Sequence, residues 1–249
     1  TATIVTNSVA PGASTTFPLY VNNTSGVADN YNLSVTGAPA GSTVTFKLDG
    51  GAGNCSTTGA TVTNTGSIAP AGNQLICAVV SMPPNALATT TGTPLTFKVQ
   101  SAVSGAADTI IDAVTVDTVR NVTLSTNNSG QAAPGGSVVY TQTLTNSGNV
   151  TEAITFANPF LTDSQIAAGW TSILYLDNGA TPLALDATDT AVTTATTFNL
   201  APGASSTLFV KVFAPSTASA GQIFPHCLHL LCTTMELAFP ASDIRDVCQ

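Results

Sequence analysis

The chain has 249 residues, enough for one large β domain or two domains of ordinary size. Only 7% of the residues are charged while 43% are hydrophobic, so Thr, Ser and Asn supply most of the surface polarity. The five basic residues are scattered and the net charge is −8, which argues against nucleic-acid binding. The apolar runs are too short for a transmembrane segment.

Short alternating segments, separated by turn residues, fill most of the chain. The opening residues 2–6 are strand-like and contain no charged and apolar leader, as expected of a mature or excised segment. Alternation of apolar and polar side chains recurs at Val44–Leu48, Leu95–Gln100 and Val138–Thr145. A period of two with Gly- and Asn-rich turns predicts an all-β fold of antiparallel sandwich sheets. One helical turn is expected, at Ser164–Ala168.

The sequence contains an internal repeat. Ala-Pro-Gly at Pro11 returns at Pro134, Leu-Asp at Asp49 returns at Asp177, and Ala-Pro at Pro70 returns at Pro202. A period near 120 residues is too long for a solenoid unit and is typical of an array of domains. We therefore expect two tandem immunoglobulin-like β-sandwich domains that meet near Thr118. Copy one would comprise residues 1–118, copy two residues 119–222, and residues 223–249 a tail of anomalous composition.

Three segments of copy two carry a resemblance: Asn121–Leu124, Ala133–Tyr140 and Leu144–Thr151. Together they resemble the immunoglobulin-like repeats of bacterial surface-layer proteins, adhesins and stalks, in which a Pro-Gly-Gly segment precedes an Asn-x-Gly-Asn turn. The resemblance covers residues 119–222 well and residues 1–118 more loosely. It implies an extracellular or cell-surface location and a non-catalytic structural role in the cell envelope or in an extracellular filament or array.

Two alternatives from other functional classes remain open. One is an adhesin or carbohydrate-binding module, for which Trp170 and Tyr175 would be the candidate sugar platform; a lone Trp on an alternating strand is more often part of a sandwich core. The other is an accessory domain of a larger secreted enzyme. Because lysines that usually protect sheet edges are scarce, we expect self-association or binding to neighbouring envelope proteins.

Two cysteines lie within copy one. We predict a disulfide between Cys55, in a Gly-rich loop, and Cys77, in a strand, because the composition is that of a secreted protein. The alternative is two unlinked thiols. The repeat places Leu183 and Phe209 at the corresponding positions of copy two, which predicts an apolar contact in place of the bond.

The tail 223–249 contains both histidines and three of the five cysteines. His226, Cys227, His229 and Cys232 are candidate zinc or copper ligands. Against a metal site, adjacent residues of a strand point to opposite faces and a second ligand pair is missing, so accidental composition is the preferred interpretation. The tail is apolar enough to complete copy two; without it, that sandwich would keep an open groove or edge.

No catalytic constellation is evident. The histidines needed for a Ser-His-Asp arrangement occur only in the tail, and no Gly-x-Ser-x-Gly segment is present. The carboxylate pairs Asp108/Asp112 and Asp186/Asp189 are interpreted as turn caps. Asp117, Asp186 and Asp189 are candidate calcium ligands, although no calcium-binding loop motif is present. We expect no enzyme activity and no cofactor, with calcium as the alternative.

Overall fold

The computed structural model describes the backbone of residues 4–125, 128–163, 169–221, 226–232 and 245–248. It also describes their side chains, except those of residues 157–163, 226–232 and 245–248. The described residues form strands and turns without an α-helix, so the predicted all-β, immunoglobulin-like sandwich fold is confirmed. The expected helical turn Ser164–Ala168 lies outside the described residues.

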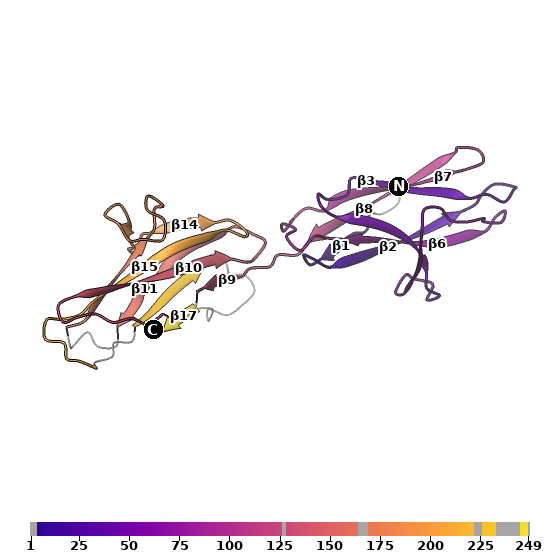
Figure 1. Ribbon diagram of the computed structural model, residues 1–249. Coiled ribbons are helices and arrows are strands. Elements are labelled where there is room, and N and C mark those ends of the chain that lie inside the picture. Colours follow the sequence, from indigo (N-terminus) through magenta and orange to yellow (C-terminus); the bar gives the residue numbers. More distant parts are fainter. Residues whose placement is uncertain (1–3, 126–127, 164–168, 222–225, 233–244, 249) are drawn as a thin grey trace. The chain divides into compact units, whose positions relative to one another are not determined.

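The chain divides into two compact units, Thr1–Val119 and Arg120–Gln249 (Figure 1). We call them unit one and unit two and describe each by itself. In the described part of the chain, no helix is long and apolar enough to span a membrane.

Unit one consists of two sheets packed face to face. The described strands are β1 (Thr6–Val9), β2 (Ser14–Asn22), β3 (Tyr31–Thr36), β4 (Thr43–Asp49), β5 (Thr58–Val62), β6 (Asn73–Ser81), β7 (Thr93–Ser101) and β8 (Ala107–Val116). One sheet has the order β1-β8-β7-β3 and the other the order β2-β6-β4-β5. The turn between β2 and β3 therefore carries the chain from one sheet to the other.

The alternation seen in the sequence determines which side chains enter the core of unit one. Phe17 on β2 and Phe97 on β7 come from opposite sheets, and their ring centroids are 5.7 Å apart. Phe46 on β4 meets the same Phe97 ring at 6.3 Å, edge to face. Burying these three rings on facing sheets provides a large apolar contribution to stability.

The first strand of unit one starts later than the sequence pattern indicates. The pattern favours a strand over residues 2–6, but the observed strand β1 begins at Thr6 and pairs in parallel with β8, Thr6 lying opposite Ala113. The Asp112 carboxylate accepts the backbone N–H of Val5 at 3.0 Å. The carbonyl of Val5 in turn accepts the N–H of Ala113 at 2.8 Å, so backbone bonding to β8 begins one residue before β1.

Unit two has the same two-layer plan. The described strands are β9 (Val122–Leu124), β10 (Ser137–Asn146), β11 (Glu152–Asp163), β12 (Thr171–Leu176), β13 (Thr190–Ala191), β14 (Thr197–Leu200), β15 (Ser205–Phe213), β16 (His226–Cys232) and β17 (Arg245–Cys248). The sheets have the orders β13-β12-β15-β10-β9 and β14-β11-β16-β17. Its first strand, β9, pairs antiparallel with β10, whereas β1 of unit one pairs with the last strand of its unit.

The C-terminal tail supplies the last strands of unit two. Strand β16 pairs with β11, and β17 pairs with β16, Leu228 lying opposite Val247. The open groove expected in the absence of these strands is therefore filled by the chain's own backbone. Trp170, considered as a sugar platform, is buried in the core of this unit together with Leu174 and Val210.

We predict that Phe17→Ala lowers the free energy of unfolding of unit one by about 3–5 kcal/mol, because the cavity would lie between the two sheets. Leu87→Ala is the matched control, since Leu87 is 61% exposed, and should change stability by less than about 0.5 kcal/mol. Urea denaturation followed by circular dichroism measures both. Equal effects of the two substitutions would contradict the assignment of the core.

Candidate functional site

A buried asparagine organises the loops at one end of unit one. The Asn23 side-chain Nδ2 donates to the carbonyl oxygens of Val27 at 2.8 Å, Ile68 at 2.9 Å and Ala69 at 3.3 Å. Its Oδ1 accepts the hydroxyl of Tyr31 at 3.0 Å. One carboxamide thus joins the β2–β3 crossover to the turn that precedes β6.

Unit two repeats this arrangement at Asn146, which is fully buried. Its Nδ2 donates to the carbonyl oxygens of Val150 and Leu200, both at 2.8 Å, and its Oδ1 accepts the N–H of Gly148 at 2.9 Å. Asn146 is the first Asn of the Asn-x-Gly-Asn motif. The motif's polarity is therefore used to hold the crossover turn, as at Asn23.

A buried carboxylate follows each asparagine. In unit one, Asp29 accepts the hydroxyl of Ser101 at 2.5 Å. In unit two the corresponding residue is Glu152, whose fully buried carboxylate accepts Nη1 of Arg120 at 2.8 Å, with the Arg120 side chain 31% exposed. Removing the arginine would take the ion-pair partner from a buried carboxylate, so the pair stabilises the start of unit two. The sequence analysis did not predict this pair. The available signal was that Glu152 follows Asn146 at the same distance at which Asp29 follows Asn23.

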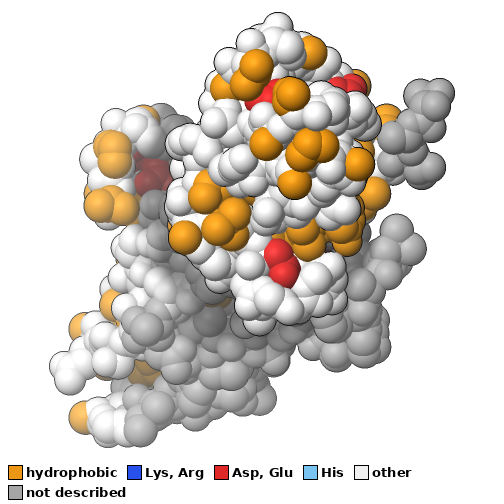
Figure 2. Space-filling view, turned by 90° about the vertical axis from the view of Figure 1, so that its right-hand side faces the viewer, with side chains coloured by type: hydrophobic (Ala, Val, Ile, Leu, Met, Phe, Trp, Pro, Cys, Tyr) orange, Lys and Arg blue, Asp and Glu red, His pale blue; other side chains and the backbone are white. Residues whose placement is uncertain are grey.

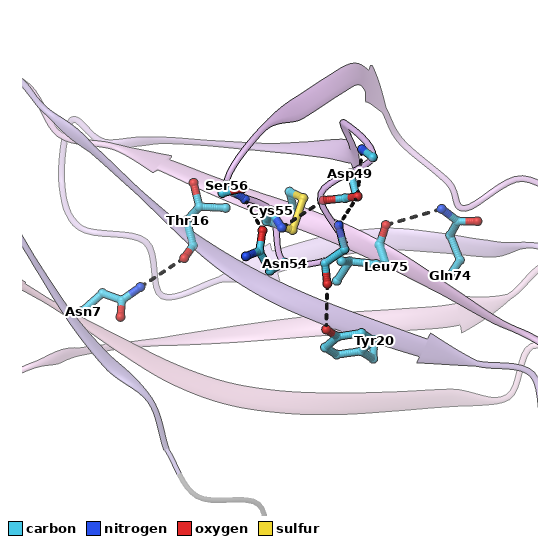
Figure 3. The surroundings of a disulfide bond; sticks show 12 residues. Asn7, Thr16, Tyr20, Asp49, Asn54, Cys55, Ser56, Gln74 and Leu75 are labelled. Atoms are coloured by element: carbon cyan, nitrogen blue, oxygen red, sulfur yellow. Dashed lines mark hydrogen bonds between the residues drawn. A yellow bond between two sulfur atoms is a disulfide. The ribbon is translucent and has the colours of Figure 1, made fainter.

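The predicted Cys55–Cys77 pair is disulfide-bonded in the structure, with the two Cα atoms 5.6 Å apart (Figure 3). The bond ties the Gly-rich loop to strand β6. The Asp49 carboxylate orders the same loop by accepting the N–H groups of Gly51 at 2.9 Å, Gly53 at 2.8 Å and Cys55 at 2.9 Å. These bonds hold the pKa of Asp49 below its ordinary value of 3.8, and the bond from Gly53 has the largest effect.

The corresponding loop of unit two has a carboxylate equivalent to Asp49, that of Asp177, but no disulfide bond. Asp177 accepts the N–H groups of Gly179 at 2.7 Å and Leu183 at 3.2 Å. Leu183 adopts a positive φ of 65°, as Cys55 does at 62°. However, Leu183 is 68% exposed while Phe209 is 0% exposed. Leu183 is thus not buried as Cys55 is, and the apolar contact expected between Leu183 and Phe209 stays a prediction.

The candidate calcium ligands bond to the protein's own backbone and hydroxyls. Asp117 accepts the hydroxyl of Ser8. Asp186 accepts the N–H of Thr188 at 2.7 Å, and Asp189 accepts the N–H of Asp186 at 2.8 Å. The Thr188 hydroxyl is the main cause that lowers the pKa of Asp186. Asp117 lies in unit one and the other two in unit two.

The carboxylate pair Asp108/Asp112 also acts on backbone amides. Asp108 accepts the N–H of Thr109 at 2.8 Å, and Asp112 accepts that of Val5. Both carboxylates thus cap strand-edge amides, and Asp112 is buried. Both residues lie within strand β8 and not in a turn, so the interpretation of this pair as turn caps is wrong.

Among the described side chains, one trio of metal-binding types comes within 4.8 Å: Asp49, Cys55 and Cys77. Since its two sulfur atoms are joined in the disulfide, the trio offers no thiolate to a metal ion. The side chains of His226, Cys227, His229 and Cys232 lie outside the described residues, so the zinc or copper site remains a hypothesis.

No protein-family model matches the chain, and no curated protein matches it. Solved structures similar to it include a chaperone–tip adhesion subunit pre-assembly complex of Csu pili from Acinetobacter baumannii, at 9% identity and TM-score 0.34, covering 99% of this chain and 98% of that chain. The CupB2 chaperone of Pseudomonas aeruginosa has 9% identity and TM-score 0.29, covering 100% and 97%. A Porphyromonas gingivalis W83 protein of unknown function has 15% identity and TM-score 0.29, covering 96% and 91%.

We predict that Asn146→Ala lowers the free energy of unfolding of unit two by about 3 kcal/mol, because it removes three hydrogen bonds of a fully buried carboxamide. Asn199→Ala is the matched control, since Asn199 is exposed, and should change stability by less than about 0.5 kcal/mol. Chemical denaturation measures both. If Asn146→Ala lowers the free energy of unfolding no more than the control does, the structural role assigned to the motif is contradicted.

We predict that reduction of the Cys55–Cys77 bond lowers the stability of unit one by about 3 kcal/mol in the chain-entropy model. Denaturation curves with and without reductant measure the loss, and a Cys55→Ser/Cys77→Ser variant should reproduce it without responding to reductant. Recovery of both cysteines as free thiols from a non-reduced digest would contradict the bond.

Proposed function

We propose that the chain is a non-catalytic structural module of a bacterial cell envelope, or of an extracellular filament or array. Its partners would be other copies of itself or neighbouring envelope proteins, and its location the cell surface. The proposal includes two tandem domains, corresponding to units one and two.

The proposal rests on one observation: the polar side chains at equivalent positions of the two units form hydrogen bonds within the protein itself. In both units, equivalent polar residues bond to the protein's own loops: Asn23 and Asn146 to crossover turns, Asp49 and Asp177 to the loops that follow β4 and β12. A catalytic site would instead leave polar groups converging on a cleft. This pattern favours a scaffold.

The surface supports association through uncharged contacts. Figure 2 shows a face on which hydrophobic side chains are scattered among uncharged polar groups, with few acidic and no basic side chains. On β8, strand β1 pairs only with Ala113–Val116. The preceding residues Ala107–Ile111 have no strand on that side among the described residues, and Ile110 and Ile111 are 36% and 45% exposed. Such an edge can add a strand from another chain.

The alternatives receive less support from the described residues. The one exposed aromatic side chain among the described large hydrophobic residues is Tyr20, whose hydroxyl donates to the carbonyl of Gly53 at 3.3 Å. A carbohydrate module would present a strip of such rings. An accessory domain of a secreted enzyme would share this fold, with the chemistry located elsewhere.

Sedimentation velocity over a wide concentration range tests the structural role. We expect concentration-dependent larger species, which Ile111→Lys should weaken because it places a charge at the exposed edge of β8. Leu87→Lys, at another exposed leucine, is the control and should associate as the unmodified protein does. If the protein stays strictly monomeric at high concentration, the structural role is contradicted. Binding of a glycan in an array experiment would then favour the alternative of an adhesin or carbohydrate-binding module.

The proposed role requires no cofactor. We predict that calcium and a chelator leave the thermal unfolding temperature unchanged, because Asp117, Asp186 and Asp189 already accept hydrogen bonds from the protein. Differential scanning calorimetry with each addition measures this. A rise with calcium that Asp189→Asn abolishes would establish a calcium site instead.

A further inference from the structure

Asn178 and Gly179 form an exposed Asn-Gly step in the loop that follows β12. Gly179 has a positive φ of 79°, and no atom beyond its two chain neighbours lies within 4 Å of the position that a Cβ would occupy. Because glycine has no side chain, none of its own atoms hinders an approach by its nitrogen. In an Asn-Gly step this nitrogen is the nucleophile that can attack the preceding side-chain amide.

The loop places a polar partner on each group that such an attack would involve. The Asp177 carboxylate accepts the N–H of Gly179 at 2.7 Å, the nitrogen that would lose its proton. The Asn178 Oδ1 accepts the N–H of Ala180 at 2.9 Å, which would stabilise negative charge developing on that oxygen. The Asn178 Nδ2, the leaving amine, donates to the carbonyl of Thr188 at 2.8 Å.

We propose that Asn178 is a self-modification site, at which the folded loop promotes deamidation. The Gly179 nitrogen forms a bond to Cγ of Asn178 and gives its proton to Asp177. The bond from Cγ to Nδ2 breaks, and Nδ2 leaves as ammonia after receiving that proton. Water then opens the resulting five-membered imide: cleavage at Cγ gives aspartate, and cleavage at the α-carbonyl carbon gives isoaspartate. No oxidant, reductant or metal is required.

The product would change the loop. It loses the Nδ2 donor to Thr188 and adds a carboxylate beside Asp177 and Asp189, both of which already face this segment. Like charges at this spacing repel. Since Leu183 is exposed and no disulfide anchors this loop, deamidation would loosen it, whereas the Cys55 loop of unit one would keep its anchor.

The loop of unit one provides an internal comparison. Asn54 also has its Oδ1 bonded to a backbone N–H, that of Ser56 at 3.0 Å. It is followed by Cys55, which has a side chain and is held in the disulfide. The side-chain carbonyl of Asn54 is therefore hydrogen-bonded as that of Asn178 is, but the nitrogen that would attack it belongs to a residue with a side chain. We expect Asn54 to remain an amide while Asn178 reacts.

Peptide mass mapping of the purified full chain, incubated at mildly alkaline pH in buffer and in urea, tests the proposal. We expect deamidation at Asn178 faster than at Asn54, and faster in the folded than in the urea-unfolded protein. Asp177→Asn should slow the folded reaction by about tenfold, less than the roughly hundredfold effect of a dedicated general base, and leave the reaction in urea unchanged. Asp49→Asn, in the loop of unit one, is the matched control and should not alter the rate.

Gly179→Ala should slow the reaction in both conditions, because the added Cβ hinders the attacking nitrogen. Asn178→Asp should loosen this loop as deamidation would, and hydrogen exchange of its backbone amides should become faster than in the unmodified protein. A folded rate at Asn178 equal to or below the rate in urea, or one unaffected by Asp177→Asn while the fold is intact by circular dichroism, would overturn the proposal.

Discussion

The hydrogen bonds of one buried asparagine in each unit hold the place where the chain crosses between sheets. A carboxamide can donate twice and accept twice, so it can serve backbone groups on two segments at once. Asn23 and Asn146 do this at corresponding positions, joining the crossover turn to the turn before β6 in one unit and to the end of β14 in the other. Without them, the crossover turns would lose the side-chain bonds that link them to the turn before β6 and to the end of β14, where the two layers must stay in register.

This use of amides is consistent with the scarcity of charge. Only 7% of the residues are charged, and the ion pair Arg120–Glu152 begins at the first residue of unit two. Elsewhere, carboxylates accept backbone N–H groups, as Asp49 and Asp177 do in equivalent loops. The surface is left largely uncharged, which suits contacts between copies more than recognition of charged ligands.

Periodicity predicted much of this fold because each strand keeps one apolar face, as at Val44–Leu48. The pairing of Cys55 with Cys77 was also accessible, since the two residues fell within one copy of the repeat. Features that depend on backbone conformation were not accessible. The exposure of Leu183 follows from a positive φ and the bonds to Asp177, neither of which an apolar residue type reveals. The pairing of β1 with β8 and of β9 with β10 likewise depends on side-chain capping and non-local contacts rather than on strand pattern.

Exchange of the side-chain amide protons with solvent, followed by nuclear magnetic resonance, tests the structural role of the two asparagines most directly. If their carboxamides hold the crossovers, the Nδ2 protons of Asn23 and Asn146 should exchange only when a unit opens, and far more slowly than those of the exposed Asn199. Exchange at the rate of Asn199 would contradict the account, because it would place both carboxamides in contact with water.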